Sequence, residues 1–217
     1  MTYKIQVIDK INRYKRKCNS DNLVLIPILD DSQNTLGFLR PITSDFKLTI
    51  KNCVELLSRW RAENPTLSPT QFQVTNVGTE HWIRNLVIQN DQRILFMVQD
   101  IENNYIGHMG FADFCYERQS AEVDLVVRGE MVAARGLMKH AIGALVRWGK
   151  KELELKHISL DVLWDNEHAI SFYERCGFHR GELIPLTRRE TKGEIQWVPH
   201  RGARFEAEKY YLHMILC

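Results

Sequence analysis

The sequence has little net charge and no long hydrophobic stretch. Its 29 Lys and Arg residues face 27 Asp and Glu residues, which gives a formal net charge of +2. A protein that binds nucleic acid by neutralising phosphates usually has a larger basic excess. The longest apolar run, 23–29, contains Pro27 and is far shorter than the ~20 residues of a membrane-spanning helix. We therefore expect neither a nucleic acid nor a membrane as partner.

Cysteines are few and scattered, which argues against a disulfide framework and a structural zinc site. No two of them form a C-x-x-C pair: they are Cys18, Cys53, Cys115, Cys176 and Cys217. No cluster of His, Cys and Asp has ligand spacing, so no metal site is predicted. The early lysines are not followed by an apolar segment of the signal-peptide type. These features predict a cytoplasmic protein.

The composition is typical of one folded unit. Of 217 residues, 44% are hydrophobic and 26% are charged, close to the average of globular domains. We expect a single domain over residues 1–217, with an N-terminal extension at 1–38 and a core at 39–217.

Hydrophobic periodicity predicts both strands and helices. Strands are expected at 22–29, 36–42, 93–100, 105–114, 121–127, 158–163, 194–198 and 204–216. Helices are expected at 45–62, from an N-cap at Thr79, at 135–151, and at 166–178 with Asn166 as its cap and Gly177 near its end. The segment 64–78 is rich in Pro, Thr and Ser and is expected to be a loop. The pattern predicts an α/β (α+β) fold around one core.

Two segments could carry chemistry. Arg135 and Gly136 open the helix that follows strand 121–127, and a helix N-terminus with a glycine and a cation is suited to a phosphate. The alternative is a glycine that only accommodates the backbone. In the helix 166–178, Asn166 and Tyr173 lie on the same side about two turns apart. Taken singly, they are interpreted as a capping residue and a core aromatic.

Together the two segments resemble the GNAT superfamily of acyl-CoA-dependent N-acyltransferases. The family motif Q/R-x-x-G-x-G/A falls on 133–138, with departures at Ala133 and Met138. The pattern L-x-V-x-x-x-N-x-x-A-I-x-x-Y-x-x-x-G-F matches at Leu160, Val162, Asn166, Ala169, Ile170, Tyr173, Gly177 and Phe178. The resemblance covers about residues 39–178. It implies a mixed, mostly antiparallel central sheet flanked by helices.

The resemblance also implies a donor site and a mechanism. The co-substrate is acetyl-CoA or another acyl-CoA, held by Leu125, Val126, Val127, Ala134, Arg135, Gly136, Leu137, Met138 and Asn166. Tyr173 is the candidate general acid for the departing thiolate. Glu122 is the candidate general base for the attacking amine, with Asp124, a histidine or water as alternatives. The competing interpretation of Glu122 is a solvated carboxylate at a strand end.

For the acceptor, the resemblance favours a nucleotide-linked (dTDP- or UDP-) amino sugar, acylated on its primary amine by direct attack in a ternary complex. The residues expected to bind it are Trp60, Arg61, Phe72, Trp82, His108 and Tyr211. The alternatives are a ribosomal-protein or peptide N-terminal acetyltransferase and a CoA-binding module without catalysis. An antibiotic-modifying enzyme is a further alternative and predicts a more acidic acceptor face. No sequence feature fixes the oligomeric state, and a homodimer is the assembly considered.

Overall fold

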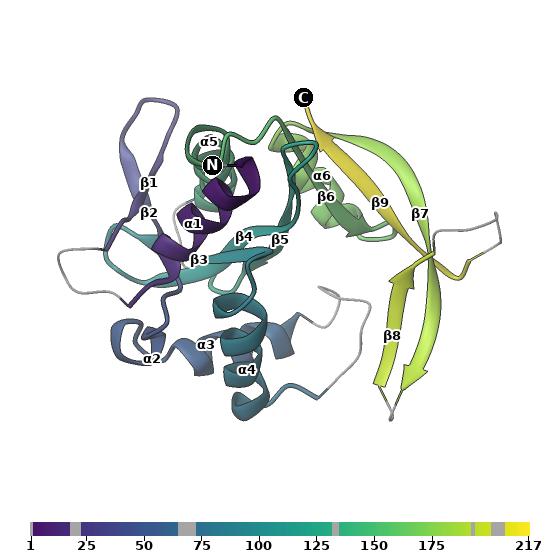
Figure 1. The fold of residues 1–217 in the computed structure, drawn as a ribbon, viewed down its shortest axis with the longest axis horizontal. Coiled ribbons are helices and arrows are strands. Elements are labelled where there is room, and N and C mark those ends of the chain that lie inside the picture. The colour runs from purple at the N-terminus through teal and green to yellow at the C-terminus, as the bar shows by residue number, and fades with distance from the viewer. Residues whose placement is uncertain (1, 18–22, 65–72, 132–134, 192–193, 201–206) are drawn as a thin grey trace.

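A nine-stranded sheet forms the centre of the molecule (Figure 1). The computed structural model describes residues 2–17, 23–64, 73–131, 135–191, 194–200 and 207–217. The strands within them are β1 (Ile26–Leu29), β2 (Thr35–Pro41), β3 (Arg93–Asp100), β4 (Tyr105–Cys115), β5 (Ser120–Arg128), β6 (His157–Leu163), β7 (Phe178–Thr191), β8 (Glu194–Pro199) and β9 (Lys209–Leu216). Their order is β1-β2-β3-β4-β5-β6-β9-β7-β8, and every neighbouring pair is antiparallel except β5 and β6. The predicted α/β fold with a mostly antiparallel sheet is confirmed.

Helices cover both faces of the sheet. They are α1 (Tyr3–Lys15), α2 (Phe46–Thr49), α3 (Cys53–Glu63), α4 (Asn76–Trp82), the π-helical segment η3 (Ile83–Ile88), α5 (Leu137–Glu152) and α6 (Glu167–Arg175). One buried cluster joins α1, α5 and α6 to residues such as Phe96 and Phe111, and a second joins α2 to η3 with Leu95 and Met97. Strand β3 is therefore buried on both faces, which explains its continuous apolar run. None of the described helices is long and apolar enough to span a bilayer.

The first helix, α1, was not expected from the polar, basic start of the sequence. Its buried residues Val7 and Ile11 belong to the same cluster as Phe96. Lys15 at its C-terminal end is also buried, and its Nζ donates to the carbonyl of Asn90 at 2.7 Å. The apolar stripe of α1 is sparse, so its periodicity is weak in the sequence alone.

Three further expectations about the elements need correction. The helix predicted at 45–62 is divided into α2 and α3, because Asn52 adopts a left-handed conformation with φ 54°, which asparagine tolerates better than most residues. The next helix is capped by Thr75 rather than Thr79: the Thr75 hydroxyl accepts a hydrogen bond from the Gly78 amide, and the loop ends earlier than predicted. Strand β7 was not predicted, and β9 begins at Lys209.

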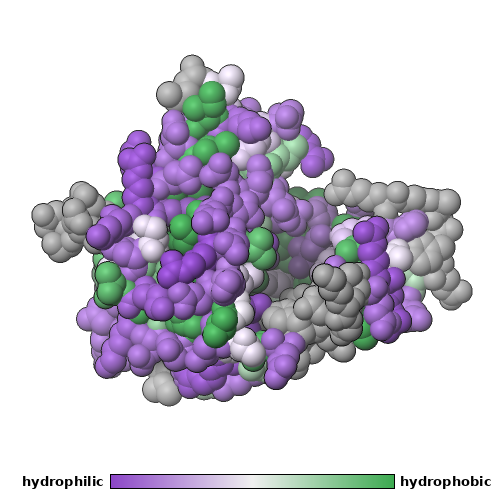
Figure 2. All heavy atoms as spheres, turned by 60° about the horizontal axis from the view of Figure 1, so that its bottom comes forward, coloured by the Kyte–Doolittle hydropathy of each residue, from purple (hydrophilic) through white to green (hydrophobic). Residues whose placement is uncertain are grey.

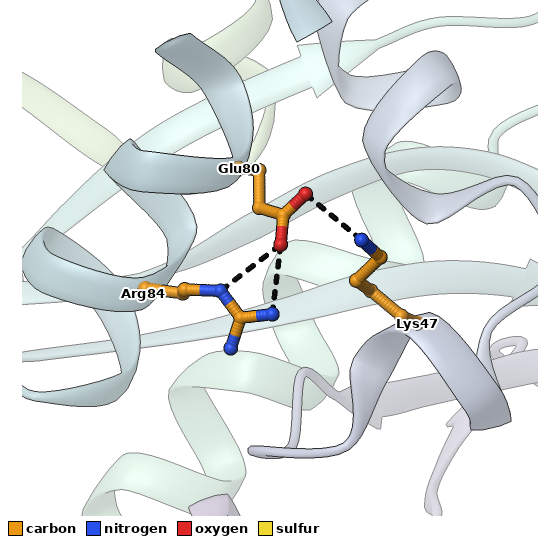
Figure 3. Close-up of polar contacts among 3 residues, drawn as sticks. All are labelled: Lys47, Glu80 and Arg84. Carbon is orange, nitrogen blue, oxygen red and sulfur yellow. Dashed lines mark hydrogen bonds and ion pairs between the residues drawn. The ribbon is translucent and has the colours of Figure 1, made fainter. Parts of the chain in front are cut away.

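Ion pairs connect α2, α4 and η3, which pack over one face of the sheet (Figure 3). The carboxylate of Glu80 on α4 accepts from Lys47 Nζ on α2 at 3.0 Å and from Arg84 Nη2 on η3 at 2.7 Å. The Arg84 guanidinium also lies 5.3 Å from the centre of the Phe46 ring. Each exposed pair contributes little alone, but together they link α2, α4 and η3 into one layer.

The sheet opens between β5 and β6. These two strands pair over three residues, Ser120–Glu122 with 157–159. Leu125 then adopts φ 53°, an unusual conformation that bends the strand locally. Beyond Glu122, β5 stays paired with β4 through Val127 and Arg128. The edge of β5 that faces β6 is therefore open over its second half.

Candidate active site

A cavity of about 350 Å³ lies where β5 and β6 separate. It brings together residues from β4, β5, β6, α6 and β9. Six of the residues predicted to act in the site line it: Glu122, Leu125, Val126, Asn166, Tyr173 and Tyr211. Their roles stay predictions, but their common position follows directly from the divergence of the two strands. On the face turned forward in Figure 2, hydrophilic residues predominate.

Glu122 has an environment that suits a general base. It lies on β5 opposite Ser159 of β6 and is partly buried. The pKa of Glu122 is raised to about 7, chiefly by burial and also by the charges of Asp161, Asp113 and Asp124, while His213 lowers it. A carboxyl group that titrates near neutrality can take a proton from an ammonium group and release it again.

The cavity is acidic. Four of its lining residues carry carboxyl groups: Asp113, Glu122, Asp124 and Asp161. Asp124 forms an ion pair with Arg93 at 3.0 Å, and burial raises the pKa of Asp124 while Arg93 lowers it. Asp161 Oδ1 lies 2.7 Å from His213 Nδ1. The excess of negative groups favours a cationic ligand and disfavours a diphosphate.

Tyr173 is held by packing on α6. The helix begins after Asn166, whose side-chain oxygen accepts from the Ala169 amide at 3.1 Å. The Tyr173 ring contacts Phe172 and Phe178 at centroid distances of 5.4 Å and 6.0 Å. Burial raises the pKa of Tyr173 well above its usual range. Its hydroxyl is therefore protonated at neutral pH.

The N-terminus of α5 fits the pyrophosphate that the sequence resemblance implies. Gly136 adopts φ 87° directly before the helix, and an added Cβ would meet nothing nearer than the His140 ring at 3.7 Å. The first intrahelical bond there joins the His140 amide to the Gly136 carbonyl, so the preceding amides have no partner within the helix. The Leu137 and Met138 side chains are buried in the main core cluster. Ala134 lies outside the described residues.

The open edge of β5 fits an extended chain of peptide-like groups. Because β6 has diverged, the backbone of Leu125 and Val126 lies at the cavity rather than in a β5–β6 ladder. The side chain of Val127 is buried and packs in the second core cluster. The residues present thus fit a pantetheine arm added as a strand, with the donor set consisting of main-chain groups.

The other described residues predicted to bind the acceptor lie on α3 (Trp60 and Arg61), at the end of α4 (Trp82) and on β4 (His108). Trp60 is fully buried, and its Nε1 donates to Glu130 at 3.1 Å. His108 packs 6.1 Å from the Trp60 ring, and burial lowers the pKa of His108 to about 4. Arg61 stacks on Trp82 at 4.6 Å.

None of these four residues lines the cavity between β5 and β6. The positions of Trp60 and His108 are explained by packing, because both side chains are buried and their rings lie 6.1 Å apart. A part in acceptor binding stays a prediction for all four. Phe72 lies outside the described residues.

Residues that sequence reasoning missed are Asp113, Asp161 and His213. Asp161 and His213 face each other across β6 and β9. The alternation around Asp161 marks it as pointing away from the core, which was the one available signal. Its pairing with a strand about 50 residues later carries no local signature.

The chain matches the family model described as an acetyltransferase (GNAT) domain over residues 38–179, more than half of its length. The fold and the match define an acyl-CoA-dependent N-acetyltransferase. The chain belongs to the GNAT acetyltransferase family, whose members use acetyl-CoA as co-substrate.

Similar proteins act on a polyamine. The spermidine N(1)-acetyltransferase of Vibrio cholerae is 29% identical over 155 residues, which cover 71% of this chain and 84% of that protein. A dodecameric structure of spermidine N-acetyltransferase from Vibrio cholerae has a TM-score of 0.57 at 17% identity, covering 82% of this chain and 91% of that chain. The spermidine/spermine N-acetyltransferase SpeG of the same organism, in complex with manganese ions, has a TM-score of 0.56 at 17% identity. The match covers 83% of this chain and 92% of that chain.

These comparisons correct the expected acceptor. A nucleotide-linked amino sugar was predicted, but the similar proteins are spermidine acetyltransferases. The cavity between β5 and β6 agrees with this correction, because its four carboxyl groups oppose a nucleoside diphosphate. The expected N-acetyltransferase activity toward an amine is confirmed.

Proposed function

We propose that this chain transfers the acetyl group of acetyl-CoA to a primary amine of a polyamine of the spermidine class, by direct attack in a ternary complex. The observation that carries the proposal is Glu122, whose pKa is raised to about 7 inside an acidic cavity that also holds Tyr173. The spermidine acetyltransferase relative supports the choice of acceptor.

On the donor side, acetyl-CoA supplies an activated acetyl thioester. The main chain at Leu125–Val127 offers an open strand edge to the pantetheine arm, and Asn166 lies in the same cavity. The amides of Leu137 and Met138, with Gly136 before them, face the pyrophosphate, and Arg135 adds a positive charge. We assign the backbone amide of Ala134 to the same pyrophosphate.

On the acceptor side, a polyamine arrives as a cation. Asp113, Asp124 and Asp161 attract it and orient its amino group toward Glu122. Glu122 takes a proton from the ammonium group, which frees the nitrogen lone pair for attack. Tyr173 gives its proton to the leaving thiolate and recovers one from the nitrogen side or from water.

An acceptor panel tests this proposal. Purified protein and acetyl-CoA are given spermidine, spermine, an N-terminal peptide and a UDP-linked amino sugar, and free thiol is followed. We expect thiol release with the polyamines alone. Turnover restricted to the peptide or the sugar nucleotide would refute the polyamine assignment.

A substitution tests the role of Glu122. Glu122→Gln should lower kcat for spermidine by ~10²–10³-fold, the usual contribution of a general base, with acetyl-CoA binding unchanged by calorimetry. The matched control is Glu117→Gln in the turn between β4 and β5, outside the cavity, which should retain the wild-type rate. A Glu122→Gln protein with full activity removes the assigned base.

A further inference from the structure

Glu122 lies at the boundary of two cavities. The second, of about 440 Å³, extends toward β7 and is lined in part by Arg118, Glu182 and His200. Glu122 and Asp161 line both cavities, whereas His213 lines the second and is not among the residues of the first. The two cavities therefore adjoin at Glu122 and Asp161.

Three adjacent strands present Glu122, Asp161 and His213 on the same face of the sheet. Glu122 is in register with Ser159, two residues before Asp161, and Asp161 is in register with His213. Their chain neighbours, such as Leu160 and Leu212, are buried on the opposite face. The side chains of Asp161 and His213 are 19% and 23% exposed, and their hydrogen bond measures 2.7 Å.

The reaction releases a proton that needs an exit. An alkylammonium ion and an acetyl thioester give an amide, a thiol and one free proton. Glu122 takes a proton in each turnover and must lose it before the next. In the ternary complex, donor and acceptor occupy the first cavity, so the second is the side that stays open to water.

From this arrangement we infer that Asp161 and His213 form a proton relay for Glu122, and this inference rests on the proposed function of Glu122 as the base. The Asp161 carboxylate accepts the Nδ1 proton of His213, which leaves Nε2 free to receive the proton from Glu122 through water. The imidazolium so formed is stabilised by Asp161 and passes the proton to solvent in the second cavity. Imidazole suits this task because its unperturbed pKa lies between pH 5 and 8. Asp161 and His213 are thus positioning residues that act through Glu122.

The two partners influence Glu122 in opposite directions. Asp161 on β6 raises the pKa of Glu122 and His213 on β9 lowers it. The other groups that act on Glu122 are Asp113 on β4 and Asp124 on its own strand, both of which raise the pKa. The remaining charged or titratable groups at this junction are Arg118, Glu182, His200, Tyr173 and Tyr211.

This opposition gives a readout that a role in packing alone would not move. The Glu122 carboxyl carbon is followed by ¹³C NMR over a pH titration of the full chain without substrates. Asp161→Asn should move the Glu122 midpoint to lower pH, and His213→Gln should move it to higher pH. The acid limb of the kcat/KM profile should follow the same directions, with KM for acetyl-CoA within about twofold of wild type.

Loss of the relay should also be visible in the rate. His213→Gln should lower kcat by ~10-fold or more, and free imidazole in the buffer should restore part of that loss. The matched control is His157→Gln, at the exposed start of β6, which should change neither the midpoint nor kcat. If His213→Gln does not fold, His213→Asn provides the same comparison.

Shifts of the same sign in Asp161→Asn and His213→Gln, or no shift in either, would overturn the relay. So would an unchanged kcat in the His213 variant. The NMR titration needs no acceptor. A negative result there would therefore reject the relay without rejecting the proposed acetyltransferase function. A fully active Glu122→Gln removes the base, whereas an inactive Glu122→Gln with unshifted Asp161 and His213 variants removes the relay alone.

Discussion

The Glu122 carboxyl makes the stability of the fold depend on pH, because its surroundings disfavour its charged form. Its pKa is about 7 in the folded protein, against about 4.3 in an unfolded chain. Between these values the folded state binds more protons than the unfolded state. The free energy of unfolding must therefore fall as the pH rises through this window.

Glu122→Gln should remove this fall in the free energy of unfolding at high pH. We expect its free energy of unfolding at pH 8 to exceed that of wild type by about 1–2 kcal/mol, after a discount for the solvent-exposed part of the side chain. At pH 4 the two proteins should agree within ~0.5 kcal/mol. Urea denaturation at both pH values measures the difference, and an equal gain at both would contradict the assigned pKa.

Tyr173 allows a second test at the same scale. Removing its hydroxyl in Tyr173→Phe leaves the ring contacts with Phe172 and Phe178 in place, so the protein should fold normally. The expected result is a fall in kcat of ~100-fold with little change in KM for acetyl-CoA. Tyr116→Phe, at a hydroxyl that accepts from Gln92 elsewhere, is the control. A wild-type rate in Tyr173→Phe would show that another group protonates the thiolate.

At the scale of elements, the N-terminus of α5 can be probed through Gly136. Gly136→Ala places a side chain at φ 87° and should cost about 1–2 kcal/mol of stability, while CoA binding stays within a few fold. Gly136→Asp adds a negative charge at the same place and should weaken CoA binding by at least ~10-fold. Calorimetry with CoA compares the two variants. Equal, tight binding in both would place the pyrophosphate elsewhere.

The sequence predicts elements well where the pattern is local. β3 to β6, α5 and α6 each have a continuous or alternating apolar pattern, and the cap at Asn166 was recognised from its position. β7 was missed because it contains Gly181 and Pro185, residues that weaken strand patterns. It is a strand because β8 and β9 pair with it. The division between α2 and α3 depends on one backbone conformation, at Asn52.

The candidate site follows the same rule. Glu122, Asn166 and Tyr173 belong to segments whose local spacing was informative, and all three line one cavity. Asp161 and His213 come together through the pairing of β6 with β9, which no local pattern reveals. At the level of the whole chain, a net charge of +2 conceals a cavity with four carboxyl groups. Composition averages over the surface and cannot show where charges collect.

At the scale of the whole molecule, α1 shares the core of the sheet. Ile11 is fully buried in the main cluster, whereas Ile5 on the same helix is 47% exposed. Ile11→Ala should lower the free energy of unfolding by about 2–4 kcal/mol, and Ile5→Ala by less than ~0.5 kcal/mol. Chemical denaturation monitored by tryptophan fluorescence measures both. Equal, small losses would mean that the segment folds separately from the sheet.

The order of strands in the sheet differs from their order in the chain at one place. β9 lies between β6 and β7, although β7 and β8 precede it in the sequence. During synthesis, domains form from the N-terminus onward, yet β7 can pair only with β8 and cannot be joined to β6 until residues 209–216 have emerged. Until then the growing polypeptide exposes one edge of β6 and the unfinished β7–β8 hairpin, the stage at which a nascent chain is most prone to join a wrong neighbour.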